Sequence, residues 1–152
     1  MKVIEIKQID SSISDDLSDL LANSPKKYIK YFTPFNFDSI TIKSVLDNSL
    51  KDTFFGIFIN QQLIGFYMLR GWDAGYEIPS YGVFISSGHK GIGLGKLTLL
   101  HAISFCRLNQ TKKLMLKVHP ENLVAKKLYE NMGFIKRGVD NKNNNLIYFK
   151  EL

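Results

Sequence analysis

The chain has 152 residues, of which 45% are hydrophobic, and its 20 Lys and Arg residues outnumber the 14 Asp and Glu residues, for a formal net charge of +6. This length fits one domain with its own core, which we expect to span residues 1–152. No apolar run approaches the ~20 residues of a membrane-spanning helix, and the single cysteine excludes both an internal disulfide and a multi-cysteine metal site. The positive charge fits a solvated lysine-rich surface and equally an anionic ligand, such as a phosphate-bearing cofactor or substrate.

The hydrophobic periodicity predicts a mixed α/β fold. The first ten residues, MKVIEIKQID, alternate apolar and polar side chains and contain acidic ones, which predicts a strand rather than a signal or transit peptide. We therefore expect a cytoplasmic protein. After this strand the predicted elements are, in chain order, helices at 14–22 and 39–50, strands at 54–59, 63–72 and 81–85, a long helix, a strand at 113–118, a helix at 123–132, and strands at 135–139 and 146–150.

A glycine-rich stretch, SSGHKGIGLGKLTLL at 86–100, lies between a predicted strand and the long helix. A strand-to-helix turn of this kind directs unpaired N–H groups and the positive end of the helix dipole at one point, and glycines let an anion approach them. Two nucleotide-binding patterns nevertheless fail. The phosphate loop G-x-x-x-x-G-K-S/T would need glycine at Lys90 and Ser or Thr at Leu97, and the dinucleotide pattern G-x-G-x-x-G would need glycine at Lys96 or Thr98.

The same stretch resembles the pyrophosphate loop of the GNAT superfamily of N-acetyltransferases. That signature is Arg or Gln, two residues, Gly, one residue, then Gly or Ala, and residues 90–95 read K-G-I-G-L-G, with Lys90 in the first position. A second family signature, Asn followed by A-x-x-L-Y-x-x-x-G-F, resembles residues 122–134, N-L-V-A-K-K-L-Y-E-N-M-G-F, and Asn122 follows Gly95 by the family's 27 positions. A lysine at position 90 still supplies a cation, although without the planar fork of arginine.

The resemblance implies a fold, an activity and a cofactor. The implied fold is a mixed, mostly antiparallel sheet of about seven strands flanked by four helices. The implied activity is transfer of an acetyl group from acetyl coenzyme A to a primary amine by direct attack in a ternary complex. The pyrophosphate would lie on residues 90–96 and the pantetheine arm along the strand at 82–85. The implied cofactor-binding residues are Val83, Phe84, Ile85, Lys90, Gly91, Ile92, Gly93, Leu94, Gly95, Lys96, Asn122 and Tyr129.

Tyr129 and Glu77 are the predicted catalytic residues. Tyrosines on an inward helix face usually belong to the core, but the resemblance implies that Tyr129 donates a proton to the leaving thiolate. A backbone N–H near Val83 and Phe84 would polarise the acetyl carbonyl. The protonated amine needs a base, and the nearest candidates in RGWDAGYEIPSYG are Glu77, which we favour, and Asp73. Both acids are also expected to contact the substrate.

The acceptor is less well specified. The segment KKYIKYFTPFNF at 26–37 is rich in aromatic and lysine residues, and in the family such a segment overhangs the acceptor pocket. Tyr31 and Phe32 are therefore predicted to bind substrate, and their setting suits an amino sugar carried on a nucleotide diphosphate as well as other small amines. These aromatic residues are equally explained as contacts that pin the helices to the sheet.

Other functional classes receive less support. The sequence shows neither a recognition helix nor a paired aromatic motif for nucleic acid, and its three histidines are not spaced as metal ligands. We expect no metal, no nucleic-acid or membrane partner, and a monomer or homodimer that binds a small-molecule amine. A protein or peptide N-acetyltransferase and a catalytically silent acyl-CoA-binding protein remain open alternatives.

Overall fold

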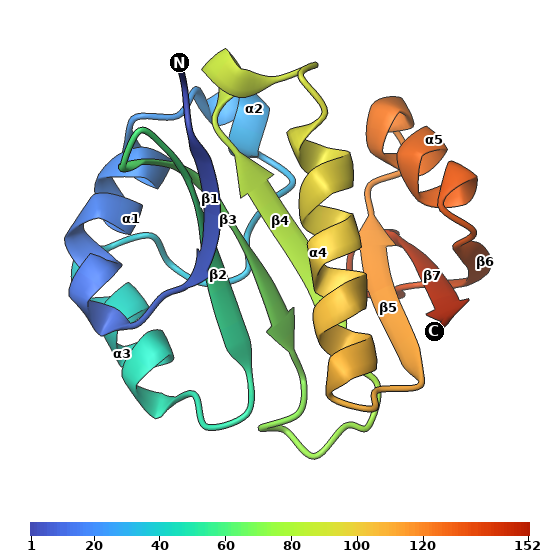
Figure 1. Ribbon diagram of the computed structural model, residues 1–152. Helices are drawn as coiled ribbons and strands as arrows, with labels where there is room; N and C mark the ends of the chain where they lie inside the picture. Colours follow the sequence, from blue (N-terminus) through green and yellow to red (C-terminus); the bar gives the residue numbers. More distant parts are fainter.

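The computed structural model describes residues 1–152 and contains one seven-stranded sheet with helices on both faces (Figure 1). The strand order is β1-β2-β3-β4-β5-β7-β6, and every neighbouring pair is antiparallel except β4 and β5. The strands are β1 (Ile4–Gln8), β2 (Thr53–Ile59), β3 (Gln62–Arg70), β4 (Ser80–Ile85), β5 (Lys113–Val118), β6 (Ile135–Val139) and β7 (Leu146–Glu151). The helices are α1 (Ser14–Ala22), α2 (Lys26–Ile29), α3 (Ser39–Asn48), α4 (Leu94–Leu108) and α5 (Leu123–Asn131), with 3-10 turns η1 (Ser11–Ile13) and η2 (Ser87–His89).

The expected mixed, mostly antiparallel sheet is confirmed, but five helices flank it rather than four. The additional helix, α2, is one turn that starts after Pro25, where the N–H of Tyr28 bonds to the Pro25 carbonyl. A helix of four residues is too short to show a 3.6-residue apolar period, so its sequence pattern could not reveal it.

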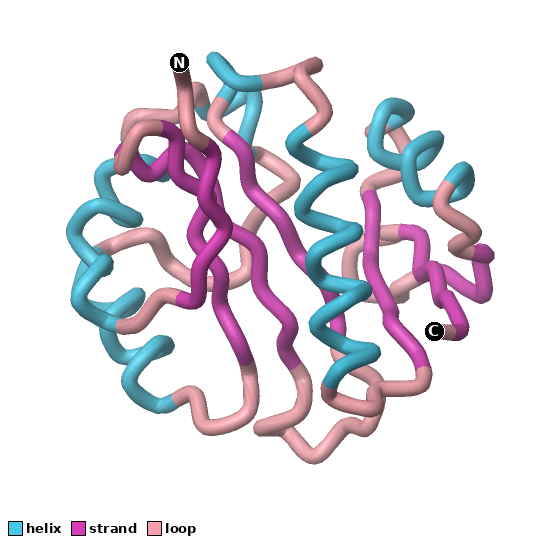
Figure 2. Tube along the Cα trace, viewed as in Figure 1, coloured by secondary structure: helices cyan, strands magenta, loops and turns pink.

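The helices form two layers. Figures 1 and 2 show α4 in front of the sheet, while α1 and α3 lie beside its β1–β3 half. The face under α4 and α5 holds the larger core cluster, which includes Tyr67, Leu99, Leu116 and Tyr148. The opposite face packs α1 and α3 on a smaller cluster of side chains from β2, β3 and β4. No helix of the protein combines the length and apolar character that a membrane crossing requires.

The two parallel strands separate along their length, and this separation creates the site described below. β4 and β5 pair only at Ser80↔Met115 and Tyr81↔Leu116, although β4 continues to Ile85 and β5 to Val118. Beyond Tyr81 the inner edge of β4 therefore has no partner strand. In the middle of a sheet, such an edge presents backbone groups that must bind something else or water.

Candidate active site

A cleft of 200 Å³ occupies the gap where β4 and β5 separate. Its lining comes from the upper halves of both strands, from α5 and from the α2 region. We call it the β4/β5 cleft. Among its lining residues are Tyr28, Tyr31, Phe32, Val83, Phe84, Ile85, Lys117, His119, Asn122 and Tyr129. The structure thus brings together seven residues predicted from the sequence: Tyr31, Phe32, Val83, Phe84, Ile85, Asn122 and Tyr129.

On the edge of β4 that faces β5, the backbone N–H and carbonyl of Val83 have no partner strand. The Pro79 carbonyl accepts the Met115 N–H at 3.0 Å, so the backbone of residue 79 points toward β5. Because alternate residues of a strand point their backbone groups to the same edge, Val83 also points that way, beyond the last pair of the ladder. Phe84 points the other way and pairs with Phe66 of β3. Of the two N–H groups expected at the acetyl carbonyl, only that of Val83 faces the cleft.

Tyr129 supplies the cleft with a hydroxyl group. The residue is 8% exposed and its ring packs against Phe134, with centroids 6.1 Å apart. Its hydroxyl makes no hydrogen bond within the protein. Because every buried side-chain nitrogen or oxygen has a hydrogen-bond partner, this unpaired oxygen is not buried, and it opens into the cleft that Tyr129 lines. Burial raises the pKa of Tyr129 to about 12, which keeps the hydroxyl protonated at neutral pH.

Asn122 serves both as a helix cap and as part of the cleft lining. Its Oδ1 accepts the N–H of Ala125 at 3.3 Å, which makes it the N-cap of α5. The side-chain NH₂ group of Asn122 has no partner in the protein and remains available in the cleft. At the other end of α5, Gly133 has φ of +84°, a left-handed conformation that favours glycine directly after a helix.

The glycine-rich loop leads directly into α4. Gly91 and Gly93 have φ of +72° and +88°, a region that favours glycine, and a Cβ at either position would meet no atom within 4 Å. Gly93 is the N-cap and brings no side-chain acceptor, so the first N–H groups of α4, at Leu94, Gly95 and Lys96, have no partner. Unpaired N–H groups at the positive end of a helix are suited to an anion.

The Lys90 side chain extends from this loop toward Tyr28, which lines the cleft. Its Nζ lies 4.0 Å from the ring centroid of Tyr28, a cation–π contact. The Tyr28 hydroxyl in turn donates to the carbonyl of Ile85, the last residue of β4. Sequence reasoning missed Tyr28, because nothing local connects a tyrosine of α2 with a loop more than sixty positions later.

Tyr31 and Phe32 lie at the cleft in different ways. Tyr31 stacks on His119, with ring centroids 3.6 Å apart, and its hydroxyl donates to Glu121 at 2.8 Å. Phe32 packs on Phe66 and Phe84, each with ring centroids 5.7 Å away, and so also belongs to the core beneath α1 and α3. Both predictions for the aromatic segment therefore apply: its side chains pack the helices against the sheet, and they line the cleft.

A second cavity of 970 Å³ lies on the sheet face that α1 and α3 leave uncovered, and we call it the open-face cavity. It adjoins the β4/β5 cleft, since Gly82 and Lys117 line both. Glu77 lines the open-face cavity and takes part in none of the four ion pairs of the protein. The predicted base therefore lies in the adjoining cavity rather than in the cleft itself, and its carboxylate forms no ion pair.

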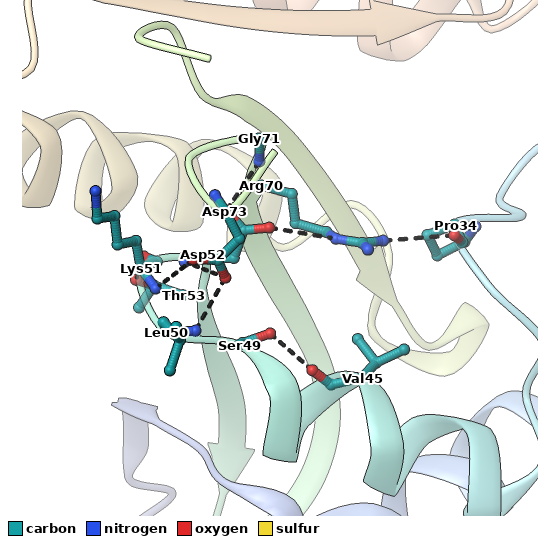
Figure 3. A network of polar contacts seen from close by, with 10 residues as sticks. All are labelled: Pro34, Val45, Ser49, Leu50, Lys51, Asp52, Thr53, Arg70, Gly71 and Asp73. Atoms are coloured by element: carbon teal, nitrogen blue, oxygen red, sulfur yellow. Dashed lines mark hydrogen bonds and ion pairs between the residues drawn. The ribbon is translucent and has the colours of Figure 1, made fainter. Parts of the chain in front are cut away.

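Asp73, expected at the substrate, has a structural position instead (Figure 3). Its carboxylate accepts the N–H groups of Leu50, Lys51 and Asp52 at 2.9, 2.8 and 3.2 Å. Asp52 in turn accepts the N–H groups of Gly71 and Asp73 at 2.9 and 3.2 Å. These reciprocal bonds join the α3–β2 connection to the loop after β3, and Asp73 lines neither cavity.

The comparisons with known proteins agree with this architecture. A 5-NmdU N-acetyltransferase of Pseudomonas phage PaMx11 is 30% identical over 90 residues, a match that covers 59% of this chain and 62%, less than two thirds, of that relative. The PaiA N-acetyltransferase of Thermoplasma acidophilum, solved in complex with coenzyme A, superimposes with a TM-score of 0.80 at 20% identity over 99% of both chains. A GNAT-family acetyltransferase of Staphylococcus aureus Mu50 gives a TM-score of 0.76 at 21% identity, again over 99% of both chains. Residues 16–134 match the family model described as Acetyltransferase (GNAT) family, and the chain belongs to that family.

Proposed function

We propose that the protein is an acetyl-CoA-dependent N-acetyltransferase that acts on a primary amine of a small molecule by direct attack in a ternary complex. The observation that carries the proposal is the opening between β4 and β5, where the free hydroxyl of Tyr129 and the free backbone edge at Val83 line one cleft. When bound, acetyl coenzyme A supplies the acetyl group in activated form, as a thioester.

The residues present fit this cofactor. The unpaired N–H groups at the start of α4 and the ammonium of Lys90 suit the pyrophosphate. The open edge of β4 offers the N–H of Val83 to the acetyl carbonyl and the Val83 carbonyl to an amide N–H of the pantetheine arm, and the free amide of Asn122 faces the same cleft. The proposed cofactor-binding residues are those expected from the sequence, residues 83–85 and 90–96 with Asn122 and Tyr129.

Tyr129 is the proposed general acid. Its raised pKa, about 12, means that the hydroxyl is present as a proton donor throughout the neutral range. It has no competing acceptor within the protein, so it is free to serve a thiolate in the cleft. General acid catalysis of this kind contributes typically 10²–10⁴-fold to a rate.

Glu77 is the proposed base on the acceptor side. An alkylamine is mostly protonated at neutral pH and must lose a proton before it attacks. The carboxylate of Glu77 lines the open-face cavity and forms no ion pair there. The amine would then enter the β4/β5 cleft past Gly82 and Lys117, where the two cavities meet. Tyr31 and Phe32 also line the cleft.

The proposed acceptor is a primary amine, and two kinds of molecule that carry one are candidates. An amino sugar carried on a nucleotide diphosphate is one candidate, and 5-NmdU, for which the phage relative is described, is a second. The test is release of coenzyme A from acetyl coenzyme A in the presence of a panel of amines, followed with a thiol reagent. Burial raises the pKa of the protein's own Cys106 thiol to about 11, so at pH 8 it stays protonated and contributes little signal.

Two results would contradict the proposal. Binding of acetyl coenzyme A without turnover of any amine would leave an acyl-CoA-binding protein. Parallel rather than intersecting lines in double-reciprocal plots of initial rate would replace direct attack with a covalent acetyl-enzyme.

A further inference from the structure

We propose that the acceptor carries an anionic group, a phosphate or a carboxylate, in addition to its amine, and that Arg137 binds this group in the open-face cavity. The inference rests on the proposed N-acetyltransferase function, because it takes the junction of the two cavities as the place of the reacting amine. It adds the class of acceptor, which neither the fold nor the cofactor site specifies.

The cavity has an apolar floor and charged walls. Its floor comes from the side chains on the uncovered face of the sheet, namely Met68, Met115, Ile147 and Phe149. Five charged residues lie around this floor: Asp52, Arg70, Glu77, Lys117 and Arg137. Such a surface suits a molecule with an apolar or ring-shaped body and charged groups at its ends.

Most of these charges are already paired. Arg70 contacts Asp52 at 3.9 Å and reaches the Pro34 carbonyl at 3.5 Å (Figure 3). Lys117 contacts Asp140 at 2.7 Å. Two charges remain without a partner, one of each sign: the carboxylate of Glu77 and the guanidinium of Arg137.

A β-bulge directs Arg137 over the cavity. In the pairing of β6 with β7, Lys136 lies opposite Tyr148 and Gly138 lies opposite Ile147, so Arg137 is an additional residue without its own partner. Bulges of this kind re-aim a side chain and recur next to active sites. A Cβ added to the neighbouring Gly138 would meet no atom within 4 Å, so the space next to Arg137 on this side is open.

The two unpaired charges are complementary to one kind of acceptor. Glu77 attracts the ammonium form of the amine, and the planar fork of Arg137 matches the oxygens of a phosphate or carboxylate. Neighbouring strands lie about 4.8 Å apart, so the backbone of β6 lies roughly 10 Å from that of β5, two strands away. The anionic group therefore lies at a distance from the amine, on the far side of the substrate's body. A polyamine would instead bring its second cation toward Arg137.

The test compares amines that differ only by the anionic group. Glucosamine with glucosamine 6-phosphate, and 3′-amino-3′-deoxythymidine with its 5′-monophosphate, probe a phosphate. Hexylamine with 6-aminohexanoate probes a carboxylate, and spermidine probes a second cation. We expect kcat/KM to be roughly tenfold higher for the anionic member of at least one pair, as one charged hydrogen-bonding contact would produce. The pair that responds identifies the anion.

Substitutions at neighbouring positions of β6 assign the effect to one side chain. Arg137→Gln should bring the ratio of kcat/KM between anionic and parent amine close to one, and Arg137→Lys should retain part of it. Lys136→Gln removes the same charge from the adjacent residue, which lines no part of the cavity, and should leave the ratio unchanged. Equal kcat/KM values within every pair, or a ratio unaffected by Arg137→Gln, would overturn the inference.

Calorimetry separates this inference from the proposed function. The anionic amine is titrated into the protein saturated with coenzyme A, and we expect Arg137→Gln to weaken binding roughly tenfold. Binding that depends on Arg137 without acetylation would support the anion site while removing the N-acetyltransferase proposal. Acetylation that does not depend on Arg137 would support the N-acetyltransferase proposal and contradict the anion site.

Discussion

Tyr31 lies flat on the imidazole of His119, with ring centroids 3.6 Å apart and 13° between their planes. The same tyrosine reaches the Glu121 carboxylate with its hydroxyl at 2.8 Å. These contacts join the segment after α2 to the turn between β5 and α5, on either side of the β4/β5 cleft. One residue thus connects two segments of the cleft lining that lie far apart in the sequence.

Loss of this contact should loosen the α2 segment. Tyr31→Ala removes both the stack and the hydrogen bond, and amide hydrogen exchange across residues 26–37 should become faster. Tyr31→Phe retains the stack and loses one hydrogen bond, worth about 0.5–1.5 kcal/mol, so exchange should accelerate by roughly 2- to 10-fold. Tyr76→Ala removes an exposed tyrosine from the loop before β4 and serves as the control. Unchanged exchange in Tyr31→Ala would show that α2 is held by its core contacts alone.

Tyr129→Phe should separate catalysis from stability. The substitution keeps the ring and its packing against Phe134 while it removes a hydroxyl that has no partner in the protein. We expect kcat with the best amine to fall about 10²–10⁴-fold, with KM for acetyl coenzyme A and the unfolding temperature nearly unchanged.

Tyr148→Phe is the matched control for that experiment. The Tyr148 hydroxyl donates to Glu130 at 2.8 Å, so its removal should lower the unfolding temperature and spare kcat. A loss of kcat below about threefold in Tyr129→Phe would exclude Tyr129 as the general acid, since such catalysis is worth far more.

Gly93→Val should abolish tight binding of coenzyme A. Valine resists the φ of +88° at this position, and its side chain would stand beside the free N–H groups of α4. Gly95→Val tests the approach alone, because Gly95 lies inside α4 and its Cβ would make an ordinary 3.6 Å contact with Leu128.

The control for backbone strain is Gly75→Val in the loop before β4. Gly75 has φ of +86° and no atom within 4 Å of a Cβ, so it carries the same conformational cost away from the glycine-rich loop. The dissociation constant for coenzyme A, measured by calorimetry on folded protein, should rise in Gly93→Val and in Gly95→Val and stay constant in Gly75→Val. An unchanged constant in Gly93→Val and Gly95→Val would refute the pyrophosphate assignment.

Asp73 should contribute to stability in a pH-dependent way. Burial opposes ionisation of this carboxyl, but three backbone N–H groups outweigh it and hold the pKa of Asp73 below its ordinary value of 3.8. A lowered folded pKa means that the stabilisation is complete above pH 3.8 and is lost as the pH falls through the folded pKa. The unfolding temperature of Asp73→Asn should therefore lie below that of the native protein at pH 6, and the gap should narrow toward pH 3.

Asp19→Asn is the control for this pH series, since Asp19 is an exposed acid whose carboxylate makes no ion pair. Its difference from the native protein should stay small at every pH. A different result would contradict the structural role of Asp73. If Asp73→Asn lowered kcat about 100-fold, as loss of a general base does, without a change in unfolding temperature, Asp73 would act on the acceptor substrate.

The sequence by itself determined the order of the strands and long helices and contained both motifs on which the proposed cofactor site rests. These features are local. Apolar periods of two and of 3.6 residues distinguish strands from helices within a few turns of chain. The left-handed glycines at Gly91, Gly93 and Gly133 occupy positions that their neighbours in sequence already define.

Only the tertiary structure decided how the site is assembled. The separation of β4 from β5, the contact of Tyr31 with His119 and the bonds of Asp73 all join residues that are distant in sequence. The bulge at Arg137 depends on the register of β6 against β7. A carboxylate in a loop has the same local signature whether it caps backbone N–H groups, as Asp73 does, or faces a cavity, as Glu77 does. The distinction depends on which other segments pack beside it, and that packing is set by the burial of the whole sheet and its helices.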